Sequence, residues 1–432
     1  MADEKKSVAE EKVSPTEKAE KSHYISAKEA RRISRENFRA VRTLEKKKHR
    51  KNVPESEYVT EMRDPNNIVE FDNLHTYFFT DAGVLKAVNG VSFDIPAHSI
   101  VGVVGESGCG KSITSMSLMQ LVQAPQGQIV DGSIRFRSDK LIPDGEEPMT
   151  ETVTDENGHE TTVPVLDKKG RQRMRPVFRK EERVVDIAKM PISEMSHIRG
   201  REISMIFQEP MTSLNPVFTI GYQLDEVTLL HVPGAIREDA KKRSLEMLKL
   251  VGIAMPERVY ASYPHELSGG MRQRVMIAIA VACNPKLIIA DEPTTALDVT
   301  IQAQVLDLLR ELKKKLDSSI MLITHDLGVI AEMADYVVVM YAGRVVEKGT
   351  VRDIFKNPAH PYTIGLHKSK PVVTAKVDRL FSIPGQVPNP IDMPDGCYFR
   401  DRCDRCTGGC RTSYPDMRQL SPTHFVACHL YD

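Results

Sequence analysis

Residues 105–112 read Gly-Glu-Ser-Gly-Cys-Gly-Lys-Ser, a complete G-x-x-x-x-G-K-S phosphate-binding loop. Glycines let such a loop curl until its backbone N–H groups face an anionic triphosphate. Lys111 is expected to reach the β- and γ-phosphates, and Ser112 to ligate Mg²⁺. The residues expected to contact the nucleotide are Gly105, Ser107, Gly108, Gly110, Lys111, Ser112 and Ile113. The pattern predicts that the chain binds ATP or GTP.

Two adjacent carboxylates, Asp291 and Glu292, follow the apolar residues 287–290. At the carboxyl end of a parallel strand, Asp291 can hold Mg²⁺, because carboxylate oxygens are preferred magnesium ligands. Glu292 can orient and polarise a water molecule as a general base. The pair adds hydrolysis of the nucleotide to the predicted chemistry.

These side chains need a parallel sheet and helices to hold them together. Residues 100–104 form an apolar run before the phosphate loop, and a plausible helix follows from Ile113. A buried strand that turns through glycines into a helix N-terminus places the helix dipole toward the phosphates. Residues 267–274 read Leu-Ser-Gly-Gly-Met-Arg-Gln-Arg and precede an alanine-rich apolar stretch. Taken alone, Ser268 there could simply be a helix N-cap.

The order of these motifs resembles the ABC ATPase family, whose signature motif is LSGGQ or a close variant. The resemblance covers roughly residues 66–349 and includes Gln208 as the Q-loop, Asp298 in the D-loop Ala-Leu-Asp and His325 as the switch histidine. It implies an α/β fold of the ABC-type P-loop ATPase, with a mixed sheet core and a helical signature subdomain. It also implies a small cysteine-rich C-terminal extension, residues 350–432.

The resemblance assigns a role to each motif. Glu292 would be the catalytic base, Gln208 would touch both Mg²⁺ and the attacking water, and His325 would help to neutralise the γ-phosphate. The signature residues Ser268, Gly269 and Gly270 would act in trans, on ATP held by another subunit. An isolated chain would then have incomplete sites and hydrolyse ATP poorly.

An aromatic side chain is expected to stack on adenine from a strand that precedes the phosphate loop. Residues 74–79 read Leu-His-Thr-Tyr-Phe-Phe, and Tyr77 and Phe78 are the candidates. Strand phase alone does not separate the two, and aromatic residues in strands often belong to the core.

Composition bounds the class of protein. The 432 residues are 41% hydrophobic and 27% charged, which is enough for a large core. Lys+Arg and Asp+Glu both number 59, so no overall charge points to nucleic acid. No run approaches the roughly 18 apolar residues of a membrane span, and no signal peptide is visible. We therefore expect a cytoplasmic protein, in which any membrane association goes through partners or a surface helix.

Two segments lie outside the ATPase core. Residues 1–65 form a charged extension, in which 1–20 are expected to be disordered and 21–51 hold twelve Lys/Arg against three Asp/Glu. A capping box at Ser26 and Glu29 starts an irregular apolar stripe, and that irregularity favours a solvated, partly helical tail; a basic amphipathic helix for anionic lipid or an acidic partner is the alternative. Residues 138–192 predict a surface insertion, with a hairpin turning at Asn157-Gly158 and a basic limb after it.

The flanks of the motifs narrow the family. Residues 207–216, 267–280 and 357–385 resemble the ATPase subunits of oligopeptide and dipeptide importers. That resemblance implies a heterodimer with a second ABC ATPase subunit, two integral membrane permeases and, indirectly, a peptide-binding protein. It also implies a peripheral position at the cytoplasmic face of the membrane. Import of a nickel chelate or an oligosaccharide is an alternative within the family, and a soluble ABC ATPase acting on ribosomes or nucleic acid is an alternative outside it.

Five of the seven cysteines fall within the last 36 residues. Cys397, Cys403, Cys410 and Cys428 form the pattern C-x5-C-x6-C-x17-C, with Cys406 left over. The pattern recurs in the importer family, where the resemblance implies a [4Fe–4S] cluster. Zinc, with His424 or His429, and free thiols are the alternatives. A cytosolic chain is not expected to hold these cysteines as structural disulfides.

Overall fold

The computed structural model describes residues 26–50, 52–154, 160–166, 169–209, 213–295, 297–369, 381–391, 393 and 395–432. The predictions for residues 1–20 and for the Asn157-Gly158 turn lie outside the described residues.

An eight-stranded mixed sheet forms the centre of the molecule, with the strand order β14-β15-β13-β12-β4-β11-β10-β9. Five neighbouring strands run parallel: β12 (Tyr336–Tyr341), β4 (Ile100–Val104), β11 (Ser319–Ile323), β10 (Leu287–Asp291) and β9 (Ile203–Ile206). Three antiparallel strands extend one edge: β13 (Arg344–Thr350), β15 (Phe425–Ala427) and β14 (Met417–Gln419). The predicted mixed sheet is thus confirmed. Its central strands are continuous apolar runs because both faces are buried.

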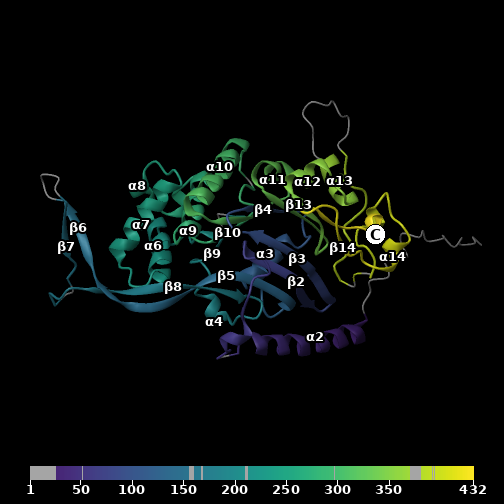
Figure 1. Ribbon diagram of the computed structural model, residues 1–432, viewed down its shortest axis with the longest axis horizontal. Helices are drawn as coiled ribbons and strands as arrows, with labels where there is room; N and C mark the ends of the chain where they lie inside the picture. The colour runs from purple at the N-terminus through teal and green to yellow at the C-terminus, as the bar shows by residue number, and fades with distance from the viewer. Residues whose placement is uncertain are drawn as a thin grey trace, which may run out of the picture.

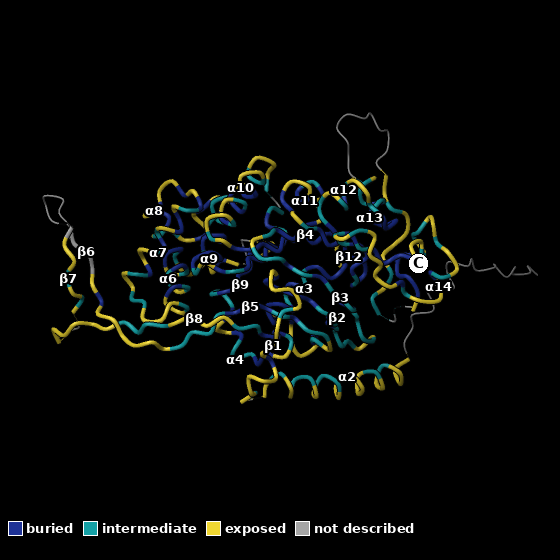
Figure 2. The backbone as a smooth tube through the Cα atoms, in the orientation of Figure 1, coloured by how far each residue is buried: buried dark blue, intermediate teal, exposed yellow. Residues whose placement is uncertain are grey.

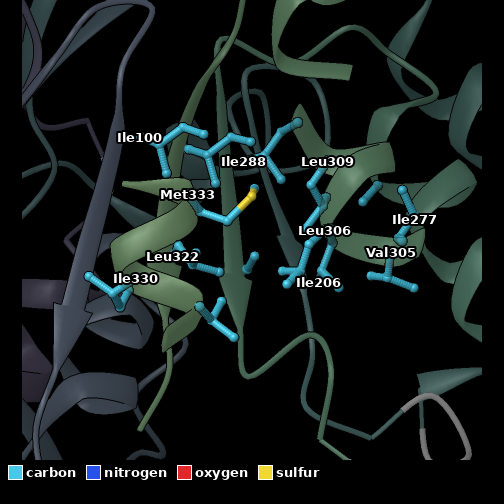
Figure 3. Packing of buried hydrophobic residues seen from close by; sticks show 14 of the residues in the cluster. Ile100, Ile206, Ile277, Ile288, Val305, Leu306, Leu309, Leu322, Ile330 and Met333 are labelled. Atoms are coloured by element: carbon cyan, nitrogen blue, oxygen red, sulfur yellow. The ribbon is translucent and has the colours of Figure 1, made fainter. Parts of the chain in front are cut away.

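Alternate residues of these strands face two different cores. Ile288 and Leu322 pack against helices α9 (Gly269–Val281), α10 (Val299–Leu316) and α11 (Leu327–Met333), as Figure 3 shows. Residues one position away, such as Ile289 and Ile323, face helix α3 (Lys111–Leu118) and a second sheet. That sheet is antiparallel, in the order β1 (Val59–Thr60), β8 (Met174–Asp186), β5 (Gly127–Pro148), β2 (Asn67–Thr80) and β3 (Gly83–Pro96).

A helical subdomain is inserted between β9 and β10. It consists of α6 (Ile220–His231), α7 (Arg237–Leu250), α8 (Pro256–Ala261) and α9. Asp225 of α6 accepts hydrogen bonds from Ser244 of α7, at 2.6 Å, and from Tyr260 of α8, at 2.5 Å. These bonds join three helices at one partly buried carboxylate. The remaining short helices are α4 (Ile192–Met195), α12 (Val351–Lys356), α13 (Pro361–Lys368) and α14 (Gly409–Thr412).

The basic N-terminal segment forms helix α2 (Ala27–Lys48), which lies along the antiparallel sheet (Figure 1). Ser26 caps it by accepting a hydrogen bond from the Glu29 N–H. The buried Asn37 donates to the Thr80 carbonyl at 2.8 Å. Figure 2 shows that the side turned away from the sheet is exposed. For these residues the structure shows a docked helix in place of the solvated tail.

The predicted insertion is a continuation of the antiparallel sheet. Strand β5 extends from Gly127 to Pro148 and pairs with β8, so residue 138 lies within a strand of the sheet. The two strands leave the molecule as a long ribbon that ends in the hairpin of β6 (Thr150–Thr154) and β7 (Glu160–Pro164) (Figure 1). An ion pair of 2.7 Å between Arg175 and Asp239 ties the ribbon to α7.

The C-terminal residues share the core of the ATPase domain. Strand β15 pairs with β13, where Val426 lies opposite Glu347. Tyr398 and Phe399 belong to the same apolar cluster as the central sheet. The C-terminal extension expected for residues 350–432 therefore packs, in its described residues, on a core that already exists.

A buried polar cluster joins β13 to the C-terminal segment. Glu347 accepts hydrogen bonds from the N–H groups of Ala359 and His360 and contacts His424 at 2.8 Å. The ring of His360 caps α13 by accepting from the Tyr362 N–H at 3.0 Å. Burial lowers the pKa of His360 to about 4, although the Glu347 charge acts in the opposite direction.

We predict that His360 makes the fold acid-sensitive. An unfolded histidine protonates near pH 6.5, whereas the buried ring stays neutral down to about pH 4. Stability present above pH 6.5 is therefore lost as the pH falls toward 4, by up to about 3 kcal/mol. His360→Asn keeps a capping oxygen and does not titrate. Between pH 7.5 and pH 5.0 the melting temperature should fall further in the wild type than in the His360→Asn variant. Equal falls in the two proteins would contradict the assignment.

Candidate active site

A cleft of about 940 Å³ opens at the carboxyl ends of the parallel strands. Its lining includes ten of the predicted site residues: Phe78, Ser107, Gly108, Gly110, Lys111, Ser112, Ile113, Gln208, Glu292 and His325. These residues come from segments far apart in the chain. The parallel strands bring them to one edge because their carboxyl ends meet there.

The phosphate loop connects β4 to α3 in a conformation that requires glycine. Gly110, the N-cap of α3, has φ +101°, and a Cβ there would lie 2.4 Å from the Ala87 carbonyl oxygen. The buried Lys111 follows, and its Nζ donates to the carbonyls of Gly105, at 2.8 Å, and Glu106, at 3.1 Å. The ammonium group thus lies inside the curve of the loop, where a phosphate would be bound.

Two of the predicted magnesium ligands are in contact. The Ser112 hydroxyl donates to Asp291 Oδ1 at 3.1 Å. Burial raises the pKa of Asp291, and the bond from Ser112 opposes that shift. A buried carboxylate without a full positive partner gains most from a cation, so this pair fits Mg²⁺. Gln208, the third predicted ligand, lines the same cleft.

Glu292 is held by three side chains. Its carboxylate accepts from Gln208 at 3.1 Å and from Thr295 at 2.9 Å, and it contacts His325 Nδ1 at 3.2 Å. Burial alone would raise the pKa of Glu292, but the bonds from His325 and Thr295 outweigh it and lower the pKa. The group is therefore an ionised, oriented carboxylate, as a general base must be.

The structure separates the two adenine candidates. Phe78 lines the cleft, whereas the Tyr77 hydroxyl donates to Asn89 at 2.9 Å and its ring is not part of the lining. Phe78 is the residue in position to stack on a base.

The signature and D-loop residues lie outside this cleft. Ser268 caps α9 by accepting from the Met271 N–H, and both Ser268 and Gly269 are exposed. Asp298 caps α10 by accepting from the Ile301 N–H at 3.0 Å and is also exposed. Gly270 begins the same helix as Gly269, next to Ile301, and Ala296 lies outside the described residues. The cleft of this chain is built without them.

Several lining residues carry no motif and were missed from the sequence. Thr295 comes from the loop after β10, and Thr80, Leu85, Lys86 and Gln126 come from the antiparallel sheet side. Val387, Pro388 and Pro390 come from the C-terminal region. Part of the proline-rich residues 384–391 thus forms a wall of the cleft.

The cysteine segment brings its residues together without a disulfide. All seven cysteines are free, and the Cys397 N–H donates to the Cys410 carbonyl at 2.8 Å. Burial raises the pKa of Cys397 to about 12, whereas hydrogen bonds from Thr407 outweigh burial and lower the pKa of Cys410. Among the described residues, no three His, Cys, Asp or Glu side chains are grouped so as to hold a metal ion. The [4Fe–4S] cluster and the zinc alternative therefore stay predictions.

Both histidines named for the zinc alternative have other partners. His424 contacts Glu347, and His429 contacts Asp432 at 2.5 Å and the Ser413 carbonyl at 2.9 Å. Across the described part of the chain, no helix combines the length and the apolar character that crossing a bilayer requires.

Comparison with known proteins identifies the family. Residues 88–295 match the family model described as "ABC transporter", and residues 346–410 match "Oligopeptide/dipeptide transporter, C-terminal region". The oligopeptide transport ATP-binding protein AppD of Bacillus subtilis is 46% identical over 85% of this chain and 98% of its own length. The dipeptide transport ATP-binding proteins DppD of Bacillus subtilis and of Lactococcus lactis are 42% and 43% identical, each over 84% of this chain and over 95% and 91% of their own lengths. The cleft, with its phosphate loop and its oriented carboxylate, is thus the ATPase site of a chain that belongs to the family of ABC-type oligopeptide and dipeptide transport ATP-binding proteins.

Proposed function

We propose that this chain hydrolyses ATP to power the import of peptides through an ABC transporter. The observation that carries the proposal is the position of Glu292, held by Gln208, Thr295 and His325 at the edge of the phosphate-loop cleft. The relatives are named for oligopeptide and dipeptide transport, which favours peptides over a nickel chelate or an oligosaccharide. The same names disfavour a soluble ATPase that acts on ribosomes or nucleic acid.

The geometry divides the reaction among the side chains. The backbone of the phosphate loop and Lys111 bind the β- and γ-phosphates, and Phe78 stacks on the adenine. Mg²⁺, held by Ser112, Asp291 and Gln208, would neutralise charge on the phosphate oxygens. Glu292 takes the proton of the attacking water, and His325 stabilises the charge that develops on the γ-phosphate.

We predict that Glu292→Gln abolishes turnover while ATP binding persists. The amide is isosteric but cannot accept a proton, so hydrolysis by the assembled transporter should fall by about 10²–10⁴-fold. Lys111→Ala is the matched control, since it should weaken ATP binding itself. Nucleotide binding and phosphate release measured side by side check both variants. Near-normal hydrolysis by the Glu292→Gln complex would overturn the catalytic assignment.

We further propose that a second ABC ATPase subunit completes the site. Ser268, Gly269, Gly270 and Asp298 lie away from the cleft of their own chain, which supports a role in trans at the ATP of a partner. Two membrane permeases would hold the pair at the cytoplasmic face of the membrane, and a peptide-binding protein would deliver the cargo. On α2, the exposed residues Arg31, Arg35, Arg39, Arg42 and Lys46, spaced three or four apart, would face anionic headgroups.

We predict that the tagged chain, expressed in its own host, fractionates with the membrane. After detergent extraction it should co-purify with one different ATPase subunit and two permeases, and its ATPase activity should rise strongly on assembly. Each site needs two chains, so the isolated chain should be slow. Full transport-level activity of a verified monomer would rule this arrangement out.

We propose that Cys397, Cys403, Cys410 and Cys428 hold a structural [4Fe–4S] cluster. Three of these cysteines are buried and the fourth is partly buried. The negative charges of their thiolates would act on one another, as the raised pKa of Cys397 reflects after the larger effect of burial. Four cysteines in one short segment, three of them buried, favour a metal over free thiols.

We predict stoichiometric iron and acid-labile sulfide in anaerobically purified protein. Replacing any one of the four cysteines by Ser should lose the iron, whereas Cys406→Ser is the matched control and should retain it. Zinc in place of iron would exclude the cluster, and the absence of both metals would exclude the ligand set.

A further inference from the structure

The phosphate loop contains an acidic residue, Glu106, directly after its first glycine. A carboxylate at this position would repel the triphosphate, because like charges within a few ångströms disfavour each other. The structure pairs it with Arg402 of the C-terminal region. Arg402 donates from both terminal nitrogens to the two oxygens of Glu106, at 2.7 and 3.0 Å.

Arg402 is fixed in this position by other contacts. Its side chain is only 6% exposed. Its Nε donates to the Pro384 carbonyl at 3.0 Å, and Nη2 reaches the Ile383 carbonyl at 3.3 Å. The guanidinium also lies near the rings of Tyr341 and Phe399. A planar fork held on several sides makes the bidentate pair specific for arginine.

The backbone of Glu106 has a second anchor in the same region. Its N–H donates to the Tyr362 hydroxyl at 2.8 Å. Tyr362 is fully buried against Tyr341 and Phe399. The side chain and the backbone of the second loop residue are therefore both held from outside the region that carries the nucleotide motifs.

The other end of the cleft also meets the C-terminal region. Ile391 forms a β-bridge with Leu85, and the Lys86 N–H donates to the Pro390 carbonyl at 3.1 Å. These bonds fix Val387 and Pro388 in the cleft lining that includes Phe78. Phe78 supplies an aromatic face for the base, so the apolar Val387–Pro388 segment is placed to border the base or the ribose.

We propose that the C-terminal region takes part in binding the nucleotide. Arg402 is a positioning residue that neutralises Glu106 and sets the phosphate loop, and Val387 with Pro388 forms a wall of the base subsite. The inference rests on the proposed ATP binding and deepens it. Removing Arg402 leaves the Glu106 carboxylate unpaired beside the triphosphate of ATP. Removing the charge of Glu106 as well should therefore restore binding.

The test measures Mg-ATP dissociation constants by titration calorimetry on the full chain. Arg402→Gln should weaken ATP binding about tenfold, the size of one lost charged hydrogen-bond pair. The double variant Glu106→Gln/Arg402→Gln should recover most of the loss, which a purely structural role for Arg402 would not predict. Arg418→Gln, at an exposed ion pair with Asp432 in the same region, is the control and should bind ATP normally. Unchanged affinity in Arg402→Gln, or no recovery in the double variant, would overturn the positioning role.

Two further variants, Arg402→Lys and Val387→Ser, test the ion pair and the base subsite separately. Should Arg402→Gln fail to fold, Arg402→Lys replaces it, and affinity equal to the wild type would count against the bidentate pair. Val387→Ser should weaken ATP but leave inorganic tripolyphosphate unchanged, because only ATP carries a base, and an equal effect on both ligands would exclude the wall. A wild-type chain that binds no ATP contradicts the proposed function itself, whereas normal wild-type binding with unaffected variants contradicts only this inference.

Discussion

Burial of the parallel strands on both faces is the constraint on which the active site depends. Val103 of β4, Ile289 of β10 and Ile323 of β11 face one core, and their neighbours in the chain face the other. No strand can slip by one residue without turning its apolar side chains into the wrong core. The register therefore fixes where each strand ends, and it fixes the phosphate loop, Asp291 and His325 at one edge of the sheet. The left-handed backbone of Glu292, with φ +47°, turns its side chain there toward Gln208 and His325.

The parts of the site that the sequence predicts are those within a few residues of a strand end. The phosphate loop, the carboxylate pair and His325 carry their chemistry in local spacing, so pattern reading finds them. The choice between Tyr77 and Phe78 depends on which side of strand β2 each residue faces. Bulges in β2 interrupt the regular alternation, so the sequence alone does not predict that side. Val387 and Pro388 were missed for a different reason, because their approach to the cleft depends on pairing with Leu85 and Lys86, about three hundred positions away in the chain.

The packing of the C-terminal region could not be predicted from its own residues. A segment with few apolar side chains can still fold when it adds them to a core built by others. Phe399 does this by packing against Tyr341 and Tyr362, and Tyr398 reaches Asn89 of β3 with its hydroxyl. The five cysteines of the C-terminal segment suggest a fold that is stabilised by a bound metal. The structure shows that aromatic packing and strand pairing also stabilise this segment. The case for metal therefore depends on the thiols themselves, and stability alone does not require it.

The pairing of β15 with β13 also bears on how the chain behaves in solution. Without the C-terminal strands, the central sheet would end at β13, a seven-residue strand whose unpaired backbone groups would be open to a strand from another molecule. The last residues of the chain cover part of that edge with β15 and finish it with β14, an exposed three-residue strand that offers little for a further strand to join. Strands β14 and β15 thus protect the sheet from edge-to-edge association with other molecules. A chain cut before β14 would expose the edge of β13 during folding and purification.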